Sequence, residues 1–359
     1  MRFYLSLFFL FLFQLLFSQE ITQRLIIFGD AGEINSKQSF LIQYANKLTI
    51  KDKTKAFFIG DNIYPSGMGL TAAESEETGN ILRSQFEGFR SLNVPVYFLA
   101  GNHDWDHSGK NGLAKLKAQE EFLHSFNDKD LRFLPKAGML TPEIIQITDK
   151  VVAIVYDSEF WLFPHHNKSI DTEKDQFIED LRKMVNENLD KTILMISHHP
   201  MVTYGDHSLI YSWKDHIFPL TDAWPPLYIP LPGIGSLYPL FRTHVTKSPE
   251  DIKHPLYQEL IQRATSITEN HPKVLFISGH DHGLQYIEKG KIRQVVSGSG
   301  SKQSHIHKRK PLKYGYNKQG FSMIDILEGN EIKVVYYIDN PKDSLTKSYE
   351  TVVDFKDKP

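Results

Sequence analysis

The sequence RLIIFGDAG occupies residues 24–32, and AFFIGDNIY occupies residues 56–64. Both contain a short, continuous apolar run that ends in glycine and aspartate. Runs of this length, rich in Val, Ile, Leu and Phe, are typical of strands that are covered on both faces. Four further runs also end at carboxylate, amide or imidazole side chains; they are Val96–Leu99, Val151–Tyr156, Ile193–Ile196 and Val274–Ile277.

Segments with helical periodicity lie between several of these runs, at residues 38–47, 76–92 and 174–188. Alternation of strands and helices is typical of an α/β fold. Near the C-terminus, two apolar stretches flank Glu328–Glu331 and predict a β-hairpin. The polar motifs at the strand ends extend from residue 30 to residue 282 and must converge on one site. We therefore expect one domain over residues 19–359.

The composition excludes several classes of protein. Lys and Arg number 41 and Asp and Glu number 43, so the net charge is −2 and no overall positive field is available for nucleic acid. The absence of cysteine excludes disulfides, thiolate metal sites and a cysteine nucleophile. Any metal site must therefore use oxygen ligands and some of the 16 histidines.

Residues 1–18 have the pattern of a secretory signal peptide, with one Arg before an apolar run that ends at Phe17. The alternative is a retained membrane anchor, because the residues around Ser18 form a poor cleavage site. A spanning helix needs about 20 apolar residues, however, and Gln14 interrupts this shorter run. We expect an exported protein, periplasmic or secreted, with no stable membrane span once the signal is removed.

Each polar motif has a simpler explanation when it is considered alone. Asp30 could cap a helix, Asp61 could occupy a turn, and His198 could belong to a strand-end turn. Together, however, the motifs offer carboxylates, an amide oxygen, a phenol and three imidazoles at strand ends. Such ligands suit Fe, Mn or Zn, and with one shared carboxylate they could hold two metal ions about 3.5–4 Å apart.

The ordered set of motifs resembles a known family. The motifs are Gly29-Asp30-x-Gly32, Gly60-Asp61-x-x-Tyr64, Gly101-Asn102-His103-Asp104, His198 and Gly279-His280-x-His282. They are similar to those of the purple acid phosphatases, which are calcineurin-like metallophosphoesterases, and most similar to the small, tartrate-resistant animal-type subgroup. The resemblance extends from about Arg24 to the terminal hairpin. It implies a β-sandwich of two mixed sheets flanked by helices, in a four-layer αββα arrangement.

The resemblance also implies the ligands of a binuclear metal centre. One metal ion would be bound by Asp30, Asp61, Tyr64 and His282, and the second by Asp61, Asn102, His198 and His280. A phenolate ligand favours a trivalent metal, so we expect Fe(III) in the Tyr64 site and Fe(II), Zn or Mn in the other.

Two more histidines receive roles from the resemblance. His103 matches a histidine that contacts the substrate phosphate, and Asp206-His207 resembles an acid–histidine pair in which the histidine protonates the leaving group. The expected reaction is hydrolysis of a phosphomonoester by in-line attack of a metal-bound hydroxide, without a phosphoenzyme and with an acid pH optimum. His199 replaces an aromatic residue usual in the family, and it would either contact substrate or occupy a turn.

Two segments depart from the subgroup or lie outside its motifs. An insertion at about residues 209–255 begins just after His207, so we expect it over the cleft, either as a lid or as a surface loop that packs on itself. The basic run His305–Lys310 follows a glycine-rich loop and would either steer anionic substrates or form a solvated surface.

Three function classes follow from these motifs. The first is an exported acid phosphatase acting on a small phosphorylated substrate. The second is a phosphoesterase with the same two-metal site that acts on diesters, nucleotides or phospholipid headgroups. The third, a non-catalytic binding protein of the same fold, is disfavoured by the complete ligand set and His103. No P-loop and no G-x-S-x-G elbow occurs in the sequence, which argues against those two chemistries.

Overall fold

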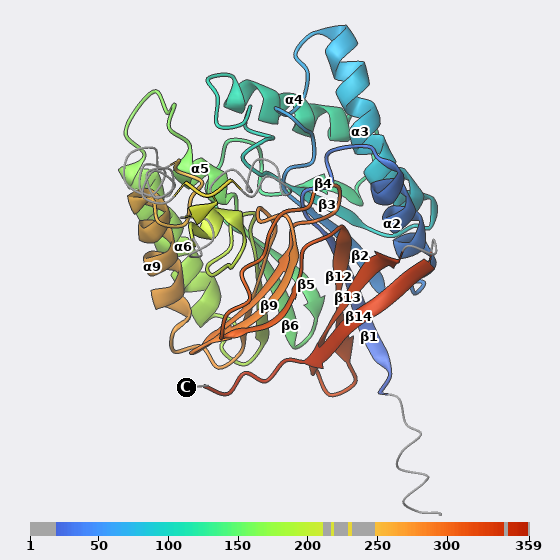
Figure 1. Cartoon of the computed structure of the whole chain (residues 1–359), viewed down its shortest axis with the longest axis vertical. Helices are drawn as coiled ribbons and strands as arrows, with labels where there is room; N and C mark the ends of the chain where they lie inside the picture. Colours follow the sequence, from blue (N-terminus) through green and yellow to red (C-terminus); the bar gives the residue numbers. More distant parts are fainter. Residues whose placement is uncertain (1–18, 211–216, 219–228, 232–247, 341–343, 358–359) are drawn as a thin grey trace, which may run out of the picture.

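The computed structural model describes residues 19–210, 217–218, 229–231, 248–340 and 344–357 (Figure 1). The predicted signal peptide at residues 1–18 lies outside the described residues, as does most of the insertion predicted at residues 209–255. None of the helices in the described ranges is both long enough and apolar enough to cross a membrane.

Two seven-stranded sheets form the centre of the described structure. The first has the order β14-β13-β12-β1-β2-β3-β4 and the second has the order β11-β9-β10-β8-β7-β6-β5. The strands of the first sheet are β1 (Ile21–Phe28), β2 (Thr54–Ile59), β3 (Val96–Leu99), β4 (Leu131–Phe133), β12 (Gly320–Leu327), β13 (Ile332–Asn340) and β14 (Ser344–Val352). Those of the second are β5 (Glu143–Thr148), β6 (Val151–Val155), β7 (Thr192–Ile196), β8 (Val274–Ser278), β9 (Leu284–Lys289), β10 (Ile292–Ser297) and β11 (Leu312–Tyr316).

Both sheets combine parallel and antiparallel pairs. In the first sheet, β1, β2, β3 and β4 are parallel, and β12 joins β1 in the antiparallel sense. In the second sheet, β6, β7, β8 and β10 are parallel, and β5 and β9 pair antiparallel with β6 and β10. The two mixed sheets confirm the predicted fold class.

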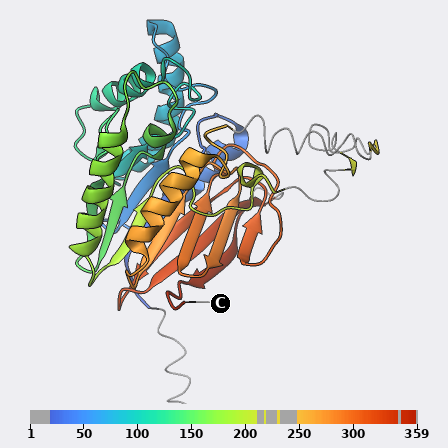
Figure 2. The same cartoon turned by 90° about the vertical axis from the view of Figure 1, so that its left-hand side faces the viewer.

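Helices cover the outer face of each sheet. On the side of the first sheet lie α2 (Ser36–Lys47), α3 (Ala72–Ser91) and α4 (Gly112–His124), and on the side of the second lie α5 (Ser158–Leu162), α6 (Asp171–Asn186) and α9 (Pro255–Thr268). In Figure 1, α2 and α3 lie to the right of the strands and α6 and α9 to the left, and Figure 2 shows α9 running along its sheet. A short 3₁₀ turn, η1 (Asp206–Ser208), lies between β7 and α9.

The core explains why the strand sequences are apolar without alternation. Along β1, Leu25 and Ile27 belong to the cluster between the two sheets, whereas Ile26 and Phe28 pack with residues of α2 and α3. Both sets are at most 1% exposed. A strand that is buried on both faces has no position for a polar residue until it ends, so the polar side chains follow directly after the strands.

The local predictions for helices and hairpin hold in the structure, with shifts at the ends. Helix α3 begins at Ala72, four residues before the predicted start, because Thr71 and Glu74 form a capping box there. The predicted hairpin corresponds to β12 and β13, but a further strand, β14, pairs with β13 at the edge of the sheet.

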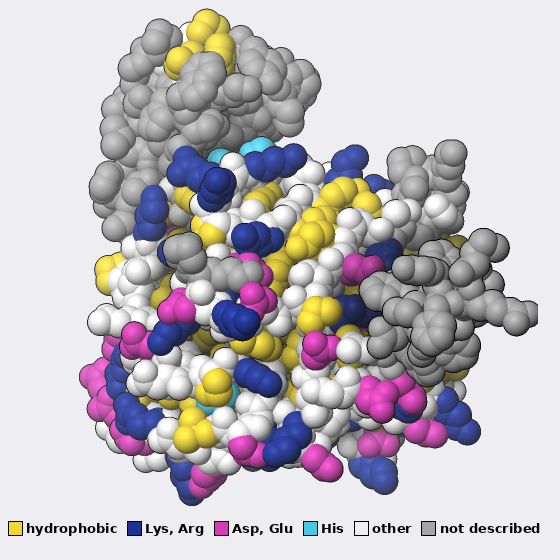
Figure 3. All heavy atoms as spheres, turned by 90° about the horizontal axis from the view of Figure 1, so that it is seen from below, with side chains coloured by type: hydrophobic (Ala, Val, Ile, Leu, Met, Phe, Trp, Pro, Cys, Tyr) yellow, Lys and Arg dark blue, Asp and Glu magenta, His cyan; other side chains and the backbone are white. Residues whose placement is uncertain are grey.

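The surface near the C-terminus carries charges of both signs. Figure 3, which views this end of the molecule, shows Lys and Arg intermixed with Asp and Glu over the described residues. This distribution agrees with the small net charge of the chain.

Candidate metal centre

Five strand ends bring the predicted ligands together. Asp30, Asp61 and Asn102 follow β1, β2 and β3 of the first sheet, and His198 and His280 follow β7 and β8 of the second. Backbone hydrogen bonds join the loops of the two sheets, such as Gly29 N–H to the carbonyl of Ser297 at 2.8 Å. Because the carboxyl ends of both parallel segments meet at one edge, ligands that are far apart in the sequence face each other.

Tyr64 is the centre of the first group of side chains. Its hydroxyl lies 3.1 Å from Asp30 Oδ1, 3.0 Å from Asp61 Oδ2 and 3.2 Å from His282 Nε2. The His282 nitrogen is also 3.4 Å from Asp30 Oδ1. Burial raises the pKa of the Tyr64 hydroxyl well above its usual value, and the Asp30 and Asp61 carboxylates raise it further. In the metal-free chain this phenol is therefore held neutral among anionic oxygens.

Asn102 is the centre of the second group. Its Oδ1 atom lies 3.1 Å from His198 Nε2 and 3.2 Å from His280 Nδ1. The other nitrogen of each ring donates to a backbone carbonyl, His198 Nδ1 to Ile59 at 3.0 Å and His280 Nε2 to Glu250 at 3.0 Å. In the tautomers that these two hydrogen bonds select, the inner nitrogen of each ring is an acceptor and faces the amide oxygen, which is also an acceptor. A cation between them satisfies all three lone pairs, so this donor set fits a metal ion.

Asp61 connects the two groups. Its Oδ2 atom faces Tyr64, whereas its Oδ1 atom lies 3.4 Å from His198 Nε2 and accepts the backbone N–H of His103 at 2.9 Å. Burial opposes ionisation of this carboxyl, but the nearby imidazoles of His198 and His103 outweigh burial and hold its pKa well below the usual range. A carboxylate with one oxygen toward each group can bridge two metal ions.

The backbone is strained at three predicted ligands. Asp30, Asp61 and His280 have φ values of 58°, 54° and 68°, in the left-handed region that L-residues rarely adopt. Such strain persists where the surrounding structure imposes it, and it is concentrated at functional sites. Gly60 precedes Asp61 with φ of 102°, and a Cβ atom there would lie 2.4 Å from His198 Nδ1. Only glycine fits this position.

His103 lies beside the two groups and reaches solvent. Its Nδ1 donates to the carbonyl of Pro65 at 2.6 Å, and its Nε2 lies 3.8 Å from Asp61 Oδ2. The side chain is 18% exposed, so a substrate could reach the ring from outside.

His207 lies beside the second group, against the ring of His280. Its ring centroid is 4.0 Å from that of His280, and its Nδ1 is 3.4 Å from Asp251 Oδ1. Burial alone lowers its pKa, but the contact with Asp251 and the charge of Asp281 outweigh burial and raise the pKa to about 9. His207 thus holds its proton at neutral pH in the metal-free chain. The carboxylate that contacts the His207 ring belongs to Asp251, and this contact was not predicted from the sequence.

His199 is buried behind the second group and does not contact solvent. Its Nδ1 is 2.8 Å from Ser158 Oγ, and its Nε2 faces Glu159 Oε2 at 3.8 Å. Burial lowers the pKa of His199 well below its usual value, so the ring is neutral. Of the two roles considered from the sequence, contact with substrate is excluded by this burial.

Several residues that support the site were not predicted. Asp104 accepts hydrogen bonds from the backbone N–H groups of Gly101 and Asn62 at 2.8 and 3.1 Å, which holds two ligand loops together. The motif Gly101–Asp104 contains this residue, so the sequence offered a signal for it. Glu250 and Asp251 lie near the end of the insertion predicted at residues 209–255, and no spacing in the sequence relates them to His280 and His207.

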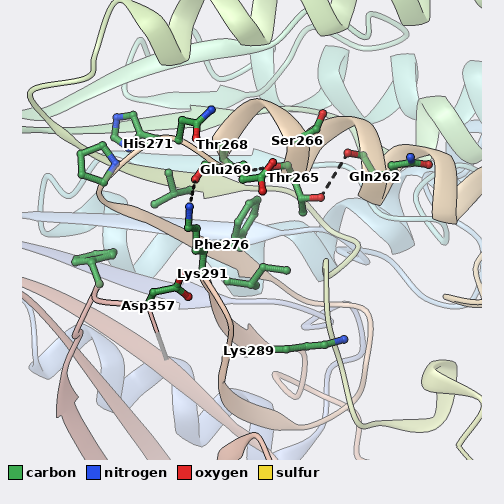
Figure 4. A pocket seen from close by; sticks show the side chains of 15 residues that line it. Gln262, Thr265, Ser266, Thr268, Glu269, His271, Phe276, Lys289, Lys291 and Asp357 are labelled. Carbon is green, nitrogen blue, oxygen red and sulfur yellow. Dashed lines mark hydrogen bonds between the residues drawn. The ribbon is translucent and has the colours of Figure 1, made fainter. Parts of the chain in front are cut away.

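A surface pocket lies away from these two groups of side chains. It has a volume of about 730 Å³ and is lined by the end of α9, the start of β8 and the β9–β10 turn, including Thr265, His271, Phe276 and Lys291 (Figure 4). Val274 at the start of β8 lines it, whereas His280 follows the end of that strand. At about 3.3 Å per residue, the pocket is therefore separate from the candidate metal centre.

Comparisons with known proteins agree with this geometry. A 38% identity over 89 residues links the chain to "Purple acid phosphatase 7" of Arabidopsis thaliana, and the match covers 23% of this chain and 27% of that protein. The chain thus spans about a quarter of the length of this relative. The relative is a plant protein, so the likeness to the animal-type subgroup stays a prediction.

Solved structures share the fold at low sequence identity. GAP50, the anchor in the inner membrane complex of Plasmodium, matches with a TM-score of 0.59 at 14% identity, covering 94% of this chain and 90% of that one. The purple acid phosphatase PPD1 from yellow lupin matches with a TM-score of 0.53 at 13% identity, covering 93% and 54%. PhoD matches with a TM-score of 0.60 at 10% identity, covering 93% and 70%.

A family model decides the classification. The model described as calcineurin-like phosphoesterase matches residues 24–223, which include five of the seven predicted ligands, from Asp30 to His198. The metal-fitting donor set described above lies at the strand ends of this same fold. The chain belongs to the calcineurin-like phosphoesterase family.

Proposed function

We propose that the chain is an exported, metal-dependent phosphomonoesterase of the purple acid phosphatase type, located in the periplasm or secreted. The observation that carries the proposal is the position of Tyr64, whose hydroxyl lies within 3.2 Å of Asp30, Asp61 and His282. A phenol among two carboxylates and an imidazole is a donor set for a trivalent metal ion. The partial likeness to a plant purple acid phosphatase supports the same conclusion.

The two groups of side chains suit different metal ions. The Tyr64 group would hold Fe(III), and Asn102, His198 and His280 with the shared Asp61 would hold Fe(II), Zn or Mn. When bound, the two ions neutralise the oxygens of the phosphate and activate water as the nucleophile.

The chain itself contributes two histidines to the reaction. His103 presents Nε2 toward the side of Asp61, where it would donate a hydrogen bond to a phosphate oxygen as charge develops there. His207 holds a proton that it would give to the oxygen of the leaving group. Asp251 stabilises the protonated form of His207 and orients the ring through Nδ1.

A visible spectrum combined with a phosphatase assay tests the proposal. Protein loaded with iron is expected to show a broad visible band and to hydrolyse p-nitrophenyl phosphate at acid pH. Tyr64→Phe should remove the band and most of the activity, while Tyr44→Phe, on the surface of α2, should leave both unchanged. A colourless protein that is active only with added Mn or Zn at neutral pH would contradict the assignment of iron.

A second substrate distinguishes a phosphomonoesterase from a phosphodiesterase. Bis(p-nitrophenyl) phosphate, assayed beside the monoester, is expected to be the slower substrate. Faster turnover of the diester would replace this proposal by a phosphodiesterase with the same site.

Export predicts a mature N-terminus near residue 19, which mass spectrometry of the periplasmic and secreted fractions can measure.

A further inference from the structure

Three consecutive residues beside the metal centre have left-handed backbone conformations. Asp106, His107 and Ser108 have φ values of 61°, 51° and 57°, and none of them is glycine. A run of L-residues in this region is unfavourable and persists only where contacts on both sides impose it. Strained backbone of this kind is concentrated at functional sites.

Both ends of the strained run are fixed by contacts. Asp106 forms an ion pair with Lys115 at 2.7 Å. Ser108 Oγ lies 2.8 Å from Glu159 Oε1 and 2.7 Å from Glu250 Oε1, within the buried region behind the metal centre. These contacts leave the residue between them, His107, in one place.

His107 is placed directly on His103. The two rings are stacked, with centroids 4.3 Å apart and planes 9° from parallel. His103 also contacts the Tyr64 ring in an edge-on arrangement, with the two centroids 4.5 Å apart. The hydrogen bond from His103 Nδ1 to Pro65 fixes one direction of the ring but still permits rotation about that direction. The stack with His107 removes this remaining freedom.

We propose that His107 is a positioning residue, which holds the plane of His103 so that Nε2 points toward the substrate phosphate. The inference rests on the proposed function, because it assigns His103 to the phosphate of that reaction. His107 itself is exposed and contacts no predicted metal ligand in the described structure. A change at this position therefore acts on the reaction through His103.

Two substitutions at residue 107 separate this role from a structural one. His107→Gly removes the ring and suits the positive φ, so Tm should be unchanged or higher. Its kcat for p-nitrophenyl phosphate should fall about tenfold, with KM changed less than twofold, because the His103 contact strengthens in the transition state. His107→Phe restores a planar ring on His103 and should keep kcat within about twofold of wild type. His124→Ala, on the exposed end of α4, is the matched control.

A spectrum of the metal-free protein tests the stack without any turnover. Long-range proton–nitrogen spectra of histidine-labelled chain should show His103 as a single tautomer protonated at Nδ1, since a carbonyl can only accept. His107→Gly should shift and broaden these signals, and His107→Phe should keep them sharp. His103→Gln assigns the signals.

The outcomes distinguish the two proposals. Unchanged His103 signals in His107→Gly would overturn the positioning role, and so would changed signals with an unchanged kcat. If His107→Gly changes the His103 signals but the wild-type protein hydrolyses neither nitrophenyl ester, the stack is supported and the proposed function is overturned instead.

Discussion

The side chain of Asp30 accepts a hydrogen bond at 2.9 Å from the backbone N–H of His280, 250 positions further along the chain. Asp30 follows β1 of the first sheet and His280 follows β8 of the second, so this contact joins the two sheets at the metal centre. Asp30 thus has two oxygens with different partners, since Oδ1 faces Tyr64. The same carboxylate that would bind a metal ion also links the loop after β1 of the first sheet to the loop after β8 of the second.

Replacement of Asp30 by asparagine should separate these two roles. The amide oxygen of Asp30→Asn can still accept the N–H of His280, so the fold should persist. The missing charge should lower the metal content from two ions per chain toward one and reduce kcat/KM by at least about a hundredfold. Metal analysis and the nitrophenyl phosphate assay measure both effects. Asp52→Asn, in an exposed turn, should retain metal and activity; full metal content in Asp30→Asn would refute its role as a ligand.

Removal of the metal ions should lower the thermal stability of the chain. With the ring tautomers that the carbonyls of Ile59 and Glu250 select, the lone pairs of Asn102, His198 and His280 face one another. Ligands bound at a thousand times their dissociation constant stabilise a protein by about 4 kcal/mol. For a chain of this size the chelated protein should therefore unfold about 6 °C lower. An unchanged Tm after exhaustive chelation, in protein shown to have held metal, would contradict the arrangement.

Substitution of Gly60 should abolish the site while a matched glycine tolerates the same change. Gly60→Ala would place a Cβ atom 2.4 Å from His198 Nδ1 and force a left-handed alanine, so metal binding and activity should be lost. Gly290 also has a positive φ, but nothing lies within 4 Å of its added Cβ. Gly290→Ala should cost about 1 kcal/mol of stability and leave activity intact. Circular dichroism and metal analysis of both variants provide the comparison.

An ion pair far from the metal centre should affect stability alone. Arg24 Nε and Nη2 lie 2.7 and 3.0 Å from the two oxygens of Asp325, which is 1% exposed. Arg24→Met leaves this carboxylate buried without its main partner and should lower the free energy of unfolding by about 3 kcal/mol. Urea titration measures this change.

The double variant is the control for this pair. Replacing Arg24 by Met and Asp325 by Leu removes both charges and should recover most of the lost stability. A double variant as unstable as Arg24→Met would show that packing, not the unpaired charge, causes the loss. Activity at 25 °C should be normal in both variants.

The fold was predictable from the sequence because its strands are buried on both faces. The six apolar runs that precede polar motifs are strands in the structure, and five of them end next to a predicted metal ligand. The sixth run ends at Asp157, which caps α5. The edge strand β14 was not predicted, since a strand with one exposed face mixes polar and apolar residues, as Lys347, Tyr349 and Glu350 do here. Helix starts shifted for a similar reason, because a cap such as Thr71 depends on one hydrogen bond and not on periodicity.

The sequence by itself determined which side chains could bind metal, because strand ends and residue types follow from local composition. Only the tertiary structure decided what those side chains face. The ring tautomers of His198 and His280 depend on carbonyls of Ile59 and Glu250, which belong to distant segments. The carboxylate beside His207 is Asp251 and not its neighbour in sequence, and the stack of His107 on His103 depends on contacts at both ends of a strained turn. Such contacts depend on packing between segments, which no local pattern of residues encodes.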